Sequence, residues 1–150
     1  MVDAPPAWVH AMMSGMSCVF CAIVAGDAEA EVVIETEGAV GFLDRSPLFA
    51  GHVLVVPRIH VVTLPELANV APFFEAVQRV AGALPAALDA QGTFVAMNNI
   101  VSQSVPHLHA HVVPRTKGDG LRGFFWPRTK YRDGEATIVA EKIRGVLASL

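Results

Sequence analysis

The sequence is poor in cysteine and in long hydrophobic runs. Its only two cysteines are Cys18 and Cys21, so a framework of several disulfides is not expected. The longest apolar runs, such as residues 53–56, fall far short of the ~20 residues that a transmembrane helix needs. No stretch resembles a signal peptide. We therefore expect a cytoplasmic protein without a membrane segment.

Charged residues are also scarce, at 17% of the chain against 53% hydrophobic residues, and the net charge is −3. This composition is typical of a compact folded protein. A net acidic chain has little electrostatic attraction to nucleic acid, so we do not expect nucleic-acid binding. A local exception lies at 115–132, where six of the eleven basic residues occur with four of the aromatic residues. We interpret this segment as a loop packed by its own aromatic side chains.

The patterns of apolar residues and turn formers predict an N-terminal extension (1–17) followed by a single domain (18–150). Within the domain we expect a catalytic core (18–115), then a basic and aromatic loop and a C-terminal helix (116–150). Strands are predicted at 31–35, 39–43, 51–57, 93–98 and 107–113. Helices are predicted at 18–25, at 63–89 with a kink or break at Pro85, and at 135–150. The fold class is therefore α+β, with five mostly antiparallel strands.

The most informative stretch is 107–111, which reads His-Leu-His-Ala-His. Alternation with period two places the three imidazoles on one face of a strand, while Leu108 and Ala110 point into a core. Three imidazoles on one face of a strand indicate a functional site rather than a chance arrangement. They could hold a catalytic Zn²⁺ with one open position, or one of them could be a nucleophile whose neighbours orient it and move protons. The spacing alone leaves both possibilities open.

Cys18 and Cys21 form a C-x-x-C pair, which in a cytosolic chain indicates a metal site or a redox motif. The redox motif expects a βαβ context that is missing here. A zinc site needs two further ligands, and these must be histidines, because there is no other cysteine. His52, His60 and the triad are the candidates. The alternative is a pair of free, buried thiols.

Together these residues resemble the histidine triad (HIT) family. His107-Leu-His-Ala-His-Val-Val matches the family signature, and Gln103-Ser-Val matches the residues that precede it. Phe42-Leu-Asp-Arg-Ser-Pro and Gly51-His-Val-Leu-Val-Val-Pro are similar to the ribose-binding strand and the central strand. The resemblance covers about residues 18–115 and implies a HIT-like fold with one long and one or two shorter helices.

The resemblance implies that His109 is a nucleophile that attacks an α-phosphorus and forms a nucleotidyl-imidazole intermediate. It implies that His111, Gln103 and Ser104 contact phosphate oxygens or the leaving group. Further positions correspond to nucleotide-binding residues of the family: Asp44 for the ribose hydroxyls, Phe20 and Ile23 beside the base, and Asn98 or Asn99 near the phosphate. For Phe20 and Ile23, plain core packing is almost as good an explanation.

Zinc-bearing members of the family place C-x-x-C at the same N-terminal position. The resemblance implies one structural zinc per chain, held by Cys18, Cys21, His60 and His107. His52 is left over, and we interpret it as a structural hydrogen-bonding residue. The chain departs from the family in the loop at 98–103, which is about two residues shorter and lacks glycine.

The implied function is hydrolysis or transfer at a nucleotide α-phosphate. The expected substrates are nucleoside phosphoramidates or dinucleoside polyphosphates, and a nucleoside monophosphate is released. The alternative is a purine-nucleotide-binding regulatory module with little turnover. The resemblance also implies a homodimer in which the sheets of two subunits are continuous.

Overall fold

The structure is a computed structural model that describes residues 17–121 and 129–150. The predicted extension 1–17 lies outside the described residues except for Ser17, as does the middle of the basic and aromatic segment. The chain divides into two compact units, one ending at Asp119 and the other beginning at Gly120. The first unit contains the predicted core, and the second contains the C-terminal helix.

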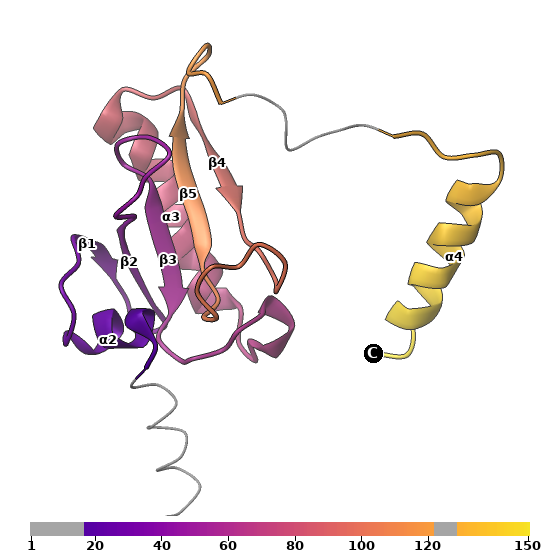
Figure 1. The fold of residues 1–150 in the computed structure, drawn as a ribbon, viewed down its shortest axis with the longest axis horizontal. Coiled ribbons are helices and arrows are strands. Elements are labelled where there is room, and N and C mark those ends of the chain that lie inside the picture. The colour runs from indigo at the N-terminus through magenta and orange to yellow at the C-terminus, as the bar shows by residue number, and fades with distance from the viewer. Residues whose placement is uncertain (1–16, 122–128) are drawn as a thin grey trace, which may run out of the picture. The chain divides into compact units, whose positions relative to one another are not determined.

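Five antiparallel strands form one sheet in the order β1-β2-β3-β5-β4 (Figure 1). The strands are β1 (Val32–Glu35), β2 (Ala39–Leu43), β3 (Val53–Pro57), β4 (Gly92–Ala96) and β5 (Ala110–Arg115). β3 pairs with β2 and with β5, so both of its edges are used within the sheet. All five residues of β3 are buried, as its continuous apolar sequence predicts. The predicted α+β architecture is confirmed.

The long helix α3 (Ala71–Leu88) covers one face of the sheet (Figure 1). Its buried residues recur every three or four positions, the spacing of a single helix face: Phe73, Ala76, Val77, Val80 and Leu84. They share a core with Leu108, Ala110 and Val112, none of which is exposed. The three apolar residues that alternate with the triad therefore point toward α3.

The short helix α2 (Val19–Ala25) packs against the sheet through a second, separate core. Phe20 and Ile23 lie there with buried residues of β2 and β3, among them Phe42 and Leu54. The helix ends at Gly26, whose φ of 81° lies in the left-handed region that glycine adopts without strain. This core positions the residues of the site described below.

Two predicted elements differ from the structure. The helix predicted at 63–89 is wrong as one element. Thr63 and Glu66 form the expected capping box, but on a separate 3₁₀ turn, η1 (Leu64–Glu66), and α3 begins only at Ala71. Pro72 accounts for the new start, because its fixed φ and missing N–H suit the first turn of a helix. α3 continues through Pro85 to Leu88.

β5 begins at Ala110 rather than at His107. Continued pairing would place His107 and Leu108 beside the end of β3, where Pro57 has no N–H to donate. The Leu108 N–H instead donates to the Val61 carbonyl at 2.7 Å. The triad therefore spans the transition from a loop into a strand.

The second unit contains helix α4 (Glu135–Leu147), close to the predicted 135–150. No residue of this helix is buried. Among the helices that the structure describes, none combines the length and hydropathy that a membrane-spanning segment requires.

Candidate active site and metal centre

The three triad histidines lie on the face of the sheet opposite α3. His107 and His109 are buried, at 0% and 2% exposure, and His111 is half-buried. The Phe20 ring packs edge-on against both His107 and His109, with a centroid separation of 5.2 Å from His109. Helix α2 therefore covers the first two imidazoles and leaves the third more open.

The orientation of the His109 ring is set by the backbone. Its Nδ1 lies 2.7 Å from the carbonyl oxygen of His107. Because a carbonyl can only accept, Nδ1 carries the proton and donates. In the neutral ring Nε2 then carries the lone pair. The His109 and His111 ring centroids are 4.9 Å apart.

His52 and His111 form a second hydrogen-bonded pair. The Leu48 N–H donates to His52 Nδ1 at 3.1 Å, so His52 in its neutral form carries its proton on Nε2. That nitrogen lies 2.9 Å from His111 Nδ1 and donates to it. His111 therefore holds its own proton on Nε2. The predicted hydrogen-bonding role of His52, which is 3% exposed, is confirmed.

Burial keeps this pair neutral. It lowers the pKa of His111 from 6.5 to about 4, and the neighbouring His109 and His52 lower it further while Asp44 opposes the shift. Burial also lowers the pKa of His52, again against Asp44. Both imidazoles are consequently uncharged near pH 7.

Asp44 follows β2 and is held by its own loop. The Ser46 N–H donates to Asp44 Oδ1 at 2.8 Å, and Oδ2 lies 3.7 Å from His52 Nε2. A cavity of about 200 Å³ brings Asp44 together with five other predicted site residues: Phe20, Ile23, Ser104, His109 and His111. The predicted site residues therefore come from four separate segments of the chain and line one cavity.

The predicted amide side chains lie elsewhere, in the loop before the triad, and do not line this cavity. Asn99 Oδ1 accepts from the Leu64 N–H at 2.7 Å, and Asn98 Nδ2 donates to the Ser102 carbonyl at 3.1 Å. Gln103 Nε2 donates to the Val62 carbonyl at 2.7 Å, and its Oε1 accepts from the Ile100 N–H at 2.9 Å. These amides hold the glycine-free loop, in which Ile100 and Ser102 adopt positive φ angles of 73° and 60°.

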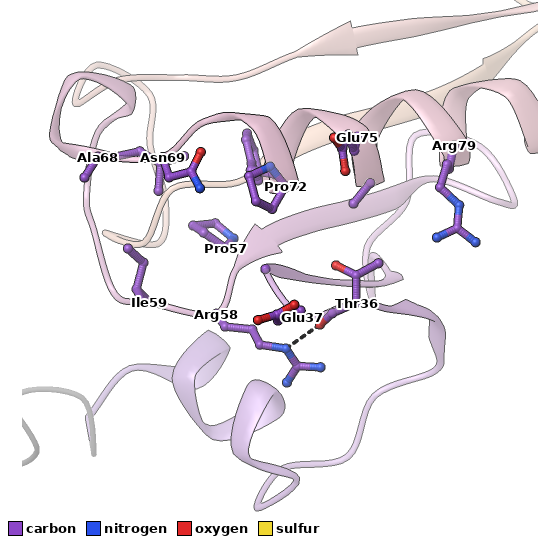
Figure 2. Close-up of a pocket in the computed structure, with 14 residues that line it drawn as sticks. Thr36, Glu37, Pro57, Arg58, Ile59, Ala68, Asn69, Pro72, Glu75 and Arg79 are labelled. Atoms are coloured by element: carbon purple, nitrogen blue, oxygen red, sulfur yellow. Dashed lines mark hydrogen bonds between the residues drawn. The ribbon is translucent and has the colours of Figure 1, made fainter.

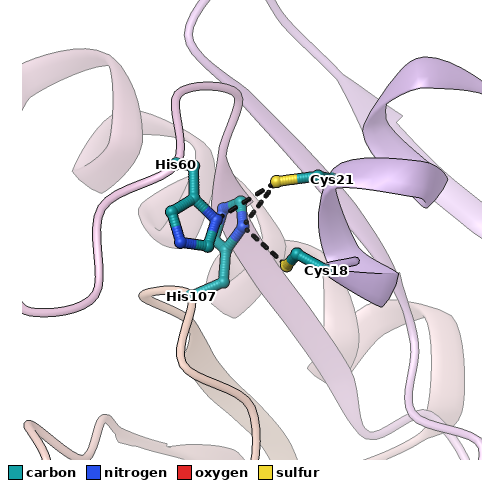
Figure 3. A group of neighbouring side chains, drawn as sticks. All are labelled: Cys18, Cys21, His60 and His107. Carbon is teal, nitrogen blue, oxygen red and sulfur yellow. Dashed lines mark hydrogen bonds between the residues drawn. The ribbon is translucent and has the colours of Figure 1, made fainter. Parts of the chain in front are cut away.

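The four predicted metal ligands form a separate cluster beside the triad (Figure 3). Cys18 and Cys21 come from the start of α2, His60 from the loop after β3, and His107 from the segment before β5. Their ligand atoms all lie within 4.8 Å of one another. The two sulfurs are each 3.5 Å from His107 Nδ1, and Cys21 Sγ is 3.2 Å from His60 Nδ1.

The donor set and its spacing fit zinc. Two thiolates and two imidazoles are a common structural zinc set, and in a tetrahedral site sulfur and nitrogen ligands lie ~3.6 Å apart. His107 Nε2 also lies 2.9 Å from the Pro57 carbonyl oxygen. It therefore donates its proton there and leaves Nδ1 free to face the sulfurs, an arrangement typical of histidine ligands.

Burial, followed by the neighbouring Cys18, raises the pKa of the Cys21 thiol to about 11. Burial lowers the pKa of His107 to about 4, against the hydrogen bond to Pro57, while His60 and His109 lower it further. A neutral imidazole is the form that binds a metal, and a bound cation favours the thiolate that burial disfavours.

A larger cavity of about 570 Å³ lies between the first half of α3, the turn that joins β1 to β2, and the end of β3 (Figure 2). Arg58 and Arg79 line it together with Glu37 and Glu75, so its charged side chains balance. Arg58 Nε donates to the Thr36 carbonyl at 2.6 Å. No triad or cysteine residue lines this cavity, which distinguishes it from the candidate active site.

The HIT domain family model matches residues 25–118. This chain belongs to the HIT family. The HIT protein is 32% identical to adenosine 5′-monophosphoramidase hnt1 of Schizosaccharomyces pombe, with 85% of this chain and 96% of the relative covered. The crystal structure of a HIT family member from Bacillus subtilis matches it with a TM-score of 0.78 and 31% identity, covering 86% of this chain and 96% of that chain. A Zn-bound histidine triad family protein from Mycobacterium smegmatis matches with a TM-score of 0.68 and 37% identity, covering 91% and 99%.

Sequence reasoning missed several cavity residues of the HIT protein. Phe42 and Leu54 line the cavity from β2 and β3. Both belong to the two strand motifs that resemble the family, but neither was assigned to the site. Arg45 lines it from the loop after β2. Its position next to Asp44 was the one available signal.

Proposed function

We propose that this HIT protein is a nucleotide hydrolase or transferase that acts on a phosphoramidate or an anhydride at the α-phosphate of a nucleotide, with His109 as the nucleophile. The observation that carries the proposal is the His109 hydrogen bond to the His107 carbonyl. It occupies Nδ1 and leaves Nε2 of a buried imidazole for a substrate, in a cavity that Asp44 also lines. The similarity to a relative named adenosine 5′-monophosphoramidase supports it.

In the first proposed step, His109 Nε2 forms a bond to the α-phosphorus and the bond to the leaving group breaks. A leaving amine takes a proton from water in the cavity, whereas a leaving nucleotide departs as an anion. Water then attacks the phosphorus, the N–P bond breaks and the water's proton passes to the solvent, which releases the nucleoside monophosphate and restores the neutral imidazole. The His107 carbonyl stabilises the positive charge on the ring while the intermediate exists.

His111 donates from Nε2 to the phosphate oxygens in this proposal. His52 is a positioning residue, because its hydrogen bond to His111 Nδ1 fixes which nitrogen of His111 carries the proton. The Ser104 hydroxyl is a further donor in the cavity, and Gln103 shapes the loop beside it. Donors held in place before the reaction stabilise charge as it develops on the phosphate.

For the rest of the nucleotide, the proposal assigns Asp44 to the ribose hydroxyls, since a carboxylate held by the Ser46 N–H can accept two hydrogen bonds. Phe20 and Ile23 provide an apolar surface for the base. The proposal places Asn98 and Asn99 in the loop that lies beside the phosphate. The substrate class is purine nucleotide conjugates, either nucleoside phosphoramidates or dinucleoside polyphosphates.

We also propose one structural zinc per chain. Cys18, Cys21, His60 and His107 would hold it, and the similarity to a Zn-bound family member supports this. Bound there, zinc would supply a fixed electrostatic and geometric anchor. His107 links the metal cluster to the nucleophile, because its side chain faces the sulfurs and its carbonyl accepts from His109. The two free thiols fit the reducing conditions of the cytoplasm.

The decisive experiment incubates the full chain with adenosine 5′-phosphoramidate and with diadenosine polyphosphates, and quantifies AMP. We expect AMP release, and a loss of at least about 10³-fold in His109→Ala, because the nucleophile is removed. A His109→Ala protein as active as the wild type would contradict the assignment. AMP binding without any product from either substrate would favour the alternative, a nucleotide-binding module.

We propose a homodimer formed through the edge strand β4, whose outer edge is unpaired within the described sheet. Exposed apolar residues continue from this edge onto α3, namely Val95 and Phe74, at 43% and 38% exposure. They line a shared shallow cavity, which a second copy could fill.

We expect a dimer by analytical ultracentrifugation and a shift toward monomer in Val95→Lys. The matched variant Val33→Lys, on the opposite edge strand, should remain dimeric; a monomeric wild type would refute the proposal.

A further inference from the structure

Arg45 has no function in the scheme above, yet it lines the same cavity as Asp44, His109 and His111. Its side chain is exposed, and its guanidinium makes no hydrogen bond or ion pair with any residue in the ranges 17–121 and 129–150. The adjacent carboxylate of Asp44 turns to the Ser46 N–H and toward His52 instead. Arg45 is thus a cation in the cavity that no described protein group satisfies.

The surroundings of Arg45 indicate which part of a nucleotide it meets. In a nucleotide the ribose lies between the phosphate and the base. With the phosphate at His109 and the ribose at Asp44, the base lies among the apolar residues from α2 and the neighbouring strands. That lining is formed by Val19, Phe20, Ile23, Ala30, Phe42 and Leu54. Among the described residues that line the cavity, Arg45 and Asp44 are the only two arginine, lysine or carboxylate side chains.

A guanidinium offers N–H donors in a planar fork and has no acceptor. The O6 and N7 atoms of guanine are two adjacent acceptors that match this fork. Adenine has an acceptor at N7, but its N6 amino group is a donor that a guanidinium cannot satisfy. Hypoxanthine has the same O6 and N7 pair as guanine.

We propose that Arg45 determines base preference by donating to O6 and N7 of a 6-oxopurine, so that the protein prefers guanosine or inosine nucleotides to adenosine nucleotides. The proposal rests on the proposed function for the location of phosphate and ribose. It deepens that function by naming the base. A contact between Arg45 and the phosphate is the competing arrangement, and it would affect all nucleotides equally.

The test measures the dissociation constants of GMP, IMP and AMP by calorimetry, for the full-length wild type, Arg45→Met and Arg45→Lys. Arg45→Met retains an unbranched apolar stem and removes the donors. We expect GMP and IMP to bind the wild type at least about tenfold more tightly than AMP. In Arg45→Met this ratio should fall toward one, mainly through weaker GMP and IMP binding. Arg45→Lys should retain only part of the preference for GMP and IMP over AMP, because the lysine ammonium lacks the planar pair of N–H donors.

Arg79→Met is the matched control, because Arg79 lies on α3 and lines other cavities. It should leave the ratio unchanged. Equal binding of GMP and AMP by the wild type would overturn the proposal. So would an equal loss for all three nucleotides in Arg45→Met, which would place Arg45 on the phosphate or ribose.

Turnover of guanosine and adenosine 5′-phosphoramidates, measured in parallel, separates the two proposals. A base preference in binding without turnover of either substrate would refute the proposed hydrolase and leave the Arg45 assignment standing. Turnover of both substrates with the same kcat/KM in wild type and Arg45→Met would refute the Arg45 assignment alone.

Discussion

At the scale of single residues, each triad imidazole has one ring nitrogen satisfied by a different partner. His107 uses Nε2 on the Pro57 carbonyl, His109 uses Nδ1 on the His107 carbonyl, and His111 uses Nδ1 on His52. The nitrogen that remains then faces thiols in the first case and is available to a ligand in the other two. Three identical side chains thereby acquire different roles, because the backbone and one further histidine fix their tautomers.

The lowered pKa of His111 predicts how folding stability depends on pH. Its ordinary pKa of 6.5 falls to about 4 in the fold, mainly by burial. Between these values the unfolded chain binds the proton and the folded chain does not, so stability falls as pH decreases from 6.5 toward 4. Urea unfolding across this range should show a steeper loss of stability in wild type than in His111→Asn, which cannot titrate there. If the wild type and His111→Asn lost stability equally as the pH falls, titration of His111 would not be the cause of the loss.

The side chains that point into the core could be predicted from the sequence, because the alternation of residues is a local pattern. The alternation at 107–111 placed Leu108 and Ala110 in the core, and the structure confirms it. The His52–His111 hydrogen bond could not be predicted, because it joins positions 59 residues apart whose rings meet only through the pairing of β3 with β5. Arg45 was quoted within the motif at 42–47 but received no role, because the sequence does not show that it lines the cavity.

At the scale of secondary-structure elements, the turn between β1 and β2 fits closely against the start of α3. A Cβ atom at Gly38 would lie only 2.3 Å from Pro72 Cβ. The helix start that the sequence did not predict is therefore also a point of tight contact. The capping box at Thr63 and Glu66 is local and was predicted. The start of α3 is also marked locally, by Pro72 in its first turn, but the apolar pattern was continuous enough to suggest one helix.

Gly38→Ala should destabilise the protein by about 1–3 kcal/mol, because the turn and the helix must move apart to admit the methyl group. Gly82→Ala is the matched substitution within α3, where nothing lies within 4 Å of the added Cβ. It should stabilise the protein by about 0.5–1 kcal/mol through the better helix propensity of alanine. Chemical unfolding of both variants measures the difference. A Gly38→Ala protein as stable as the wild type would show that the contact relaxes without cost.

At the scale of the whole molecule, the cysteine and histidine cluster joins segments that are far apart in the sequence. Cys18 contacts His107 across 89 positions, and Cys21 contacts His60 across 39 positions. The cluster therefore connects α2, the loop after β3 and the segment before β5. The family resemblance supplied all four residues, and the structure brings them together; composition and spacing alone had left the choice of histidines open.

Removal of the proposed zinc should consequently loosen the contacts that orient the nucleophile. Elemental analysis of purified protein should find about one zinc per chain. Chelation should lower Tm by about 10 °C or more, because a ligand that binds only the folded chain stabilises it by mass action. Added zinc should restore the Tm of the stripped wild type but not that of Cys18→Ser, which lacks one ligand. Cobalt in place of zinc should give a sulfur-to-metal charge-transfer band in the wild type, weakened in the variant. A wild-type protein whose Tm is the same with and without chelator, and that gives no such band, would refute the zinc site. The cluster would then be two thiols, one buried and one half-buried, beside two histidines. The His109 assignment would rest on the active-site geometry alone.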